Sequence, residues 1–142
     1  MEGWVLGQLD LILTAFNWGA ICFVSGVHYP LFADVSVTHF VNYHRKHVSR
    51  TTLLLGTSLS LEMFLTGFRF LSGPHNLIHS MPLVFLILGW LITFLISVPQ
   101  HRQLEHGFSE KAHRILLFSN WARVATWGFC LLLKFVPGIE LN

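Results

Sequence analysis

Histidine is the residue type with the clearest chemical potential in this sequence, with nine copies among 142 residues. His44 and His47 stand three positions apart in Tyr-His-Arg-Lys-His, a spacing that puts both imidazoles on one face of a helix. Neutral imidazole is a ligand of zinc, copper and iron, and an axial ligand of haem. The pair predicts a transition-metal or haem site, completed by His101 and by His28 or Glu62. The alternative is that these histidines lie at the membrane surface, in contact with water or lipid phosphates.

A second candidate site consists of ionisable and amide side chains inside apolar stretches. At a rise of 1.5 Å per residue, Glu62 lies about 18 Å and Arg123 about 13 Å from the same end of their helices. A charge in hydrocarbon is costly unless it is paired, so we expect these two residues to form an ion pair with Asn120 as neighbour. Glu62, Asn120 and Arg123 are predicted to be catalytic, at a site for a proton, a substrate or the polar group of a quinone. The alternative is an ion pair that only locks the bundle.

Two tryptophans stand close to Arg123 in the sequence. Trp121 precedes it by two positions and Trp127 follows it by four. We predict that they shape an aromatic pocket that binds a cofactor, with packing in the core as the alternative.

Helices that cross a membrane must position these residues. The chain is 53% apolar and 11% charged, whereas an average soluble domain is roughly 45–50% apolar and about 25% charged. Apolar runs at 8–33, 50–71, 79–99 and 114–136 are each long enough to cross hydrocarbon about 30 Å thick. Lipid cannot satisfy bare backbone groups, which requires helices. We predict an all-α integral membrane four-helix bundle, with residues 1–142 as one domain.

The segments that connect the runs carry different signals. Residues 34–49 contain no Gly or Pro and continue a helical periodicity, so the second helix is predicted to extend into the cytoplasm. Gly73 and Pro74 predict a turn. Tyr29-Pro30 and Val98-Pro99 are predicted to end the first and third spans, because proline interrupts a helix.

Polar side chains recur on one face of each span. His44 and Glu62 are 18 residues apart, which is five helical turns. The other spans carry similar stripes: Asn17 and His28; Trp90, Thr93, Ser97 and His101; and His113, Asn120, Arg123 and Trp127. We expect all four stripes to face one shared interior.

The basic residues predict the orientation of the chain. Arg45, Lys46, Arg50, Arg102, Lys111 and Arg114 lie near the two longer loops, and Arg69 and Lys134 lie near the other ends. The excess places the loops in the cytoplasm and both termini outside it, in a multi-pass protein of the cell inner (plasma) membrane. The net charge of +2 does not suggest nucleic acid as a partner. The first run has no basic start, so this span is expected to be retained.

Three segments together resemble a known group of proteins: His28-Tyr29-Pro30-Leu31-Phe32, Val98-Pro99-Gln100-His101-Arg102-Gln103-Leu104 and Asn120-Trp121-Ala122-Arg123. They are similar to small four-helix bacterial membrane proteins that include the anthrone-oxygenase-like family, in which a proline-containing exit from the third span and a Trp-and-Arg motif in the fourth recur. The resemblance covers most of the chain and implies a four-helix fold, with an oxygenase role known for a few members. The chain departs from the pattern at Asn120 and at the additional His44 and His47.

Two functions remain open from the sequence. One is a small membrane enzyme of oxidoreductase type with a histidine-bound metal or haem at the cytoplasmic face and the Glu62, Asn120 and Arg123 site beside it. The other is a non-enzymatic accessory subunit of a larger membrane complex. A transporter is less favoured because no pair of discontinuous helices is visible, although a homo-oligomer would be able to form one.

Overall fold

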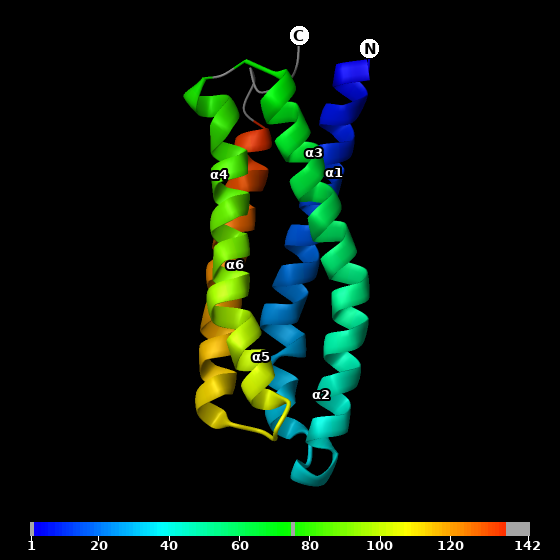
Figure 1. Cartoon of the computed structure of the whole chain (residues 1–142), viewed down its shortest axis with the longest axis vertical. Helices are drawn as coiled ribbons and strands as arrows, with labels where there is room; N and C mark the ends of the chain where they lie inside the picture. The colour runs from blue at the N-terminus through cyan, green and yellow to red at the C-terminus, as the bar shows by residue number, and fades with distance from the viewer. Residues whose placement is uncertain (1, 75, 136–142) are drawn as a thin grey trace.

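The chain folds into four long helices that run alternately up and down (Figure 1). The computed structural model describes residues 2–74 and 76–135, and no strand occurs among them. The four helices that are long and apolar enough to cross a membrane are Gly3–Asp34, Val37–Ser72, Leu77–Leu104 and Glu110–Lys134. The predicted all-α class with four helices is confirmed. The end of the predicted run 114–136 lies outside the described residues.

Three of the four long helices are interrupted by a π-helical segment, and their parts are as follows. The first contains α1 (Glu2–Phe23), the π-segment η1 (Val24–His28) and the 3-10 helix η2 (Pro30–Asp34). The second contains α2 (Val37–Thr51), η3 (Thr52–Gly56) and α3 (Thr57–Ser72). The third contains α4 (Leu77–Ile92), η4 (Thr93–Ser97) and α5 (Val98–Leu104). The fourth is α6 (Glu110–Lys134), which is continuous.

The helices form a closed ring in which each one contacts two others. α6 packs against α1 and α4, and α3 packs against the same two helices from the other side. The start of α1 and the end of α6 lie at one end of the bundle, and the connections after η2 and α5 lie at the opposite end (Figure 1). The second helix runs from Val37 through to Ser72, which agrees with the helical periodicity after Asp34.

Capping residues mark where two of the helices begin. Asn76 precedes α4 and its side-chain oxygen accepts a hydrogen bond from the backbone of His79 at 2.8 Å. Ser109 caps α6 in the same way, accepting from Ala112 at 3.4 Å. Gly107 lies just before this cap with φ at 141°, a conformation that L side chains rarely adopt.

The two prolines that were expected to end spans do not end them. In both helices a π-segment comes directly before the Xaa-Pro pair, and the backbone N–H of Tyr29 bonds to the carbonyl of Val24, five residues earlier, at 2.9 Å. The N–H of Val98 bonds to Thr93 across the same interval. Because the helical register changes there, Pro30 and Pro99 fall in the first turn of a new helical segment, where a missing N–H costs little.

The interior contains two apolar clusters, one toward each end. The cluster near the loops is built from Val24, Tyr29, Phe32, Phe40, Leu104, Ala112 and Leu116. The cluster toward the termini is built from Ile21, Leu59, Leu86, Trp127 and Cys130. Large apolar side chains also cover the outer surface, which suits a lipid surrounding.

Gly89 on α4 lets α6 come close, because a Cβ atom at this position would overlap the ring of Trp127. We expect Gly89→Ala to lower the thermal unfolding midpoint, because overpacking a tight core typically costs about 1–3 kcal/mol. Gly19→Ala is the matched control, since no atom lies within 4 Å of its added Cβ. It should be neutral or stabilising, because alanine favours a helix over glycine. Equal midpoints for the two variants in the same detergent would contradict the close packing.

Candidate functional site

The four histidines predicted as metal ligands lie together near the loop end of the bundle. They come from three different long helices and form two hydrogen-bonded pairs. His28 Nε2 lies 2.6 Å from His47 Nδ1, and His44 Nε2 lies 3.0 Å from His101 Nδ1. The rings of His47 and His101, one from each pair, stack with centroids 5.8 Å apart. We call these four residues the histidine cluster.

Tyr29 extends the histidine cluster, although the sequence did not single it out as a site residue. Its hydroxyl lies 2.9 Å from His101 Nε2, and its backbone oxygen accepts a hydrogen bond from His113 at 2.8 Å. His44, His101 and Tyr29 therefore form one continuous chain of hydrogen-bonding groups. The available signal was its position in the sequence, because Tyr29 directly follows His28, a predicted interior residue, and directly precedes Pro30.

Aromatic side chains pack against the histidine cluster. Phe32 and Phe40 are fully buried. The ring of Phe32 has its centroid 5.0 Å from that of His47 and 5.8 Å from that of His44. Burial of imidazoles is costly unless they are hydrogen-bonded, and the pairing gives each of the four rings at least one hydrogen-bond partner.

The positions of the nitrogens bear directly on metal binding. Among residues 2–74 and 76–135, no group of three or more His, Cys, Asp or Glu side chains is placed to hold a metal ion. Nitrogens that share a tetrahedral ion lie roughly 3.3 Å apart, given metal–nitrogen distances of about 2.0–2.1 Å. The pairs at 2.6 and 3.0 Å are closer than this. In this arrangement the imidazoles share protons, and a shared ion would require each pair to separate slightly.

A cavity of about 210 Å³ lies beside the histidine cluster. His101 and Tyr29 form part of its wall, together with Asn120 and Arg123 from α6. All three π-segments also line it, through Val24 of η1, Thr52, Leu55 and Gly56 of η3, and Thr93, Phe94 and Ser97 of η4. π-Segments inside α-helices are rare and are frequent at functional sites.

Arg123 is buried at the wall of this cavity, with 8% of its surface exposed. Its Nη1 donates to Asn120 Oδ1 at 2.9 Å, and its guanidinium lies 5.5 Å from the centre of the Trp127 ring. The predicted ion pair with Glu62 is wrong, because Glu62 bonds to other residues. Periodicity placed both residues in the interior, but it does not specify which neighbour each one meets.

The two tryptophans near Arg123 have different surroundings. Trp127 is fully buried, whereas Trp121 is 52% exposed on the outer surface. The predicted pocket of two tryptophans is therefore wrong, because only Trp127 lies beside Arg123. Two residues turn a helix by about 200°, which sends Trp121 to the opposite face, while four residues return Trp127 to the same face.

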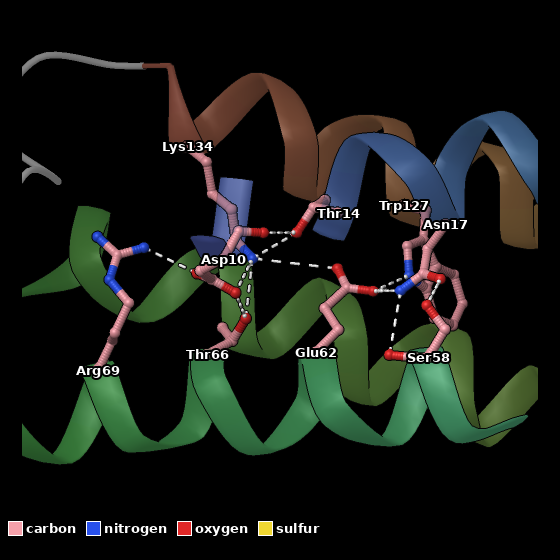
Figure 2. A network of polar contacts seen from close by, with 9 residues as sticks. All are labelled: Asp10, Thr14, Asn17, Ser58, Glu62, Thr66, Arg69, Trp127 and Lys134. Atoms are coloured by element: carbon pink, nitrogen blue, oxygen red, sulfur yellow. Dashed lines mark hydrogen bonds and ion pairs between the residues drawn. The ribbon is translucent and has the colours of Figure 1, made fainter. Parts of the chain in front are cut away.

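Glu62 belongs to a separate polar network toward the termini (Figure 2). Its Oε2 accepts from Asn17 Nδ2 at 2.6 Å and from Trp127 Nε1 at 3.0 Å. Asn17 also accepts a hydrogen bond from Ser58 at 2.6 Å. Lys134 Nζ lies 4.0 Å from Glu62 Oε1, which gives this carboxylate its cation.

Asp10 is the centre of the same network (Figure 2). Its carboxylate receives Arg69 at 2.7 Å, Lys134 at 2.8 Å and Thr66 at 2.7 Å, and it is fully buried. Lys134 also donates to Thr14 at 2.7 Å. Two acidic and two basic side chains thus balance one another. We call Asp10, Glu62, Arg69 and Lys134 the charged network.

Sequence reasoning missed three members of the charged network. Arg69 and Lys134 were used only to predict the orientation of the chain, and Asp10 was not considered as a site residue. A signal was present, because Arg69 follows Glu62 by seven residues and Asn17 follows Asp10 by seven, which places each pair on one helical face.

No known protein family matches the chain, and no curated protein or solved structure shows significant similarity to it. The resemblance to the anthrone-oxygenase-like group stays a prediction.

We expect Asp10→Asn to destabilise the protein strongly. Removing the charge of Asp10 leaves the buried cations Arg69 and Lys134 without their central carboxylate, and breaking a buried pair typically costs about 3–5 kcal/mol. The control is Glu110→Gln, which removes an exposed ion pair with Arg114 whose charged atoms are 4.0 Å apart. Such pairs are worth about 0–1 kcal/mol. Denaturant unfolding in one detergent measures both variants, and similar losses would argue against a structural role for the charged network.

Proposed function

We propose that the chain is a metal-dependent membrane enzyme of oxidoreductase type, with the histidine cluster and the adjacent cavity as its reaction site. The observation that carries the proposal is the meeting of His28, His44, His47 and His101 from three long helices. Four imidazoles in one place are a ligand set that suits zinc, copper, iron or nickel.

A purely structural role explains the cluster less well. The charged network already ties α1, α3 and α6 together at the other end of the bundle. The histidine cluster instead stands beside a cavity, and three helices depart from α-helical geometry to line it. Ionisable side chains inside a membrane bundle commonly mark functional sites. A role as an accessory subunit has no comparable observation in its favour.

The size of the site favours a metal ion over haem. The cavity of about 210 Å³ is smaller than the roughly 300–1,000 Å³ that drug-sized ligands occupy, and haem is larger still. His28 is only partly buried, so its ring has room to turn away from His47 and open that pair. A redox-active ion bound there would supply the electrons or accept them.

The chain's own residues supply the acid–base part of such a reaction. The Tyr29 hydroxyl stands at the cavity wall, where it can hold a proton or pass it to a substrate oxygen. His101 Nε2 stands behind it at a hydrogen-bond distance of 2.9 Å and orients the hydroxyl.

We also propose that the protein lies in the cell inner membrane with its two longer loops in the cytoplasm. The support is the excess of Lys and Arg at the loop end, together with the placement of both connections at that end (Figure 1). The histidine cluster then lies near the cytoplasmic surface.

The metal is tested by elemental analysis and an ultraviolet-visible spectrum of the purified chain. We expect about one transition-metal ion per chain, because ligands from a folded site bind as a set. The double variant His44→Ala/His47→Ala should lose most of it. His106→Ala is the matched control, since His106 is exposed in the loop after α5 and lies outside the cluster.

Either of two outcomes would contradict the proposal. Wild-type protein purified without chelator that contains no stoichiometric metal would overturn the proposal. Equal metal content in the double variant and the His106→Ala control would move the metal away from the histidine cluster.

Orientation is tested with single cysteines in a background that lacks Cys22 and Cys130. Gly3→Cys reports on the start of α1 and Gln103→Cys on the end of α5. A membrane-impermeant maleimide is added to intact spheroplasts. Gly3→Cys should be labelled in the intact spheroplasts, whereas Gln103→Cys should be labelled only after lysis. The opposite pattern would reverse the proposed orientation.

A further inference from the structure

We propose that Arg123 binds the carboxylate of a small aromatic molecule whose ring occupies the cavity beside the histidine cluster. The inference names a substrate class for the proposed enzyme and in that respect rests on the proposed function. The binding site itself stands on separate observations: the charge balance of the interior, the free edge of the guanidinium, and the size and lining of the cavity.

Arg123 is a buried cation without an anion among the described residues. The buried acids Asp10 and Glu62 have Arg69 and Lys134 as their cations, so the charged network is already neutral. Asn120, the hydrogen-bond partner of Arg123, carries no charge. A lone guanidinium in a bundle surrounded by hydrocarbon is costly, and an anionic ligand would remove that cost.

The guanidinium has one edge available for a ligand. Nη1 is engaged by Asn120, whereas Nε is buried without a hydrogen-bond partner. Nε–H and one Nη2–H point in parallel along the other edge of the planar group. That edge has the spacing of the two oxygens of a carboxylate, the bidentate geometry for which arginine is suited.

The cavity fits an aromatic ring next to this edge. A cavity of about 150 Å³ with an apolar lining holds one benzene molecule, and this one is larger, at about 210 Å³. The difference leaves room for a carboxylate. Trp90 and Phe94 both line the cavity, and their rings stack with centroids 5.1 Å apart, which adds aromatic surface to the lining. Tyr29 and His101 line the same cavity as Arg123.

Benzoate is the probe, and benzamide is its neutral counterpart of nearly the same shape. Isothermal titration on the full chain in lipid nanodiscs should show saturable binding of benzoate, at least tenfold tighter than that of benzamide. A wild-type protein that binds neither compound, or binds both equally, overturns the proposal.

Three variants localise the binding. Arg123→Gln should abolish the preference for benzoate, and Arg123→Lys should weaken it because lysine cannot form the bidentate contact. The control Arg102→Gln removes an exposed charge outside the cavity and should bind as wild type does. Equal benzoate affinity in Arg123→Gln and the wild type contradicts the assignment.

A cavity-filling variant tests the site while keeping the charge. Gly56 lines the cavity, and an added Cβ would meet only Thr52, at an ordinary 3.6 Å. Gly56→Leu should therefore remove benzoate binding while leaving Arg123 in place, and unchanged binding would move the ligand elsewhere. If Arg123→Gln does not fold, this variant and the benzamide comparison decide the question.

Benzoate binding and metal binding can be tested independently of each other. Arg123→Gln should keep the metal content of the wild type, and His44→Ala/His47→Ala should keep benzoate binding. Loss of the metal with benzoate binding intact overturns the proposed function alone, and loss of benzoate binding with the metal intact overturns this inference alone.

Discussion

Hydrocarbon offers no hydrogen bonds, so each polar side chain inside these helices must find its partner within the bundle. The protein meets this constraint in two ways. Toward the termini, Asp10 and Glu62 are neutralised by Arg69 and Lys134. Toward the loops, imidazoles pair with one another. Arg123 lies between the two groups and belongs to neither. It places a cationic side chain in the lining of the cavity.

Periodicity predicted which face of each helix looks inward, and it did so because burial follows the 3.6-residue repeat. His44, Asn120 and Trp127 all proved to be buried. It failed on partners, because a helical face does not specify its neighbour. Glu62 was assigned to Arg123 since the two lie at similar depth, but the real partner, Lys134, stands at the far end of α6 and reaches back along the helix.

The π-segments were also beyond prediction from sequence. In a π-segment each carbonyl bonds to the N–H five residues ahead, and such segments are too rare to be expected from a helical hydrophobic pattern. Pro30 and Pro99 were read as helix ends, because proline disrupts a regular α-helix. Each instead follows a π-segment, where the change of register places the proline in a first turn. The histidine cluster depends on this, since His28 ends η1 and His101 lies in α5.

The contact between Asp10 and Lys134 joins the first helix to the last residue of the fourth. In the membrane topology proposed above, the first span is synthesised and inserted before the fourth. The Asp10 carboxylate therefore first has no cation, and then has only Arg69 from the second span, until Lys134 is in place. The charged network therefore reaches electrical neutrality only when the final turn of α6 is in place. A chain shortened by that single turn would keep its four helices but would lack Lys134, the cation that Asp10 and Glu62 share.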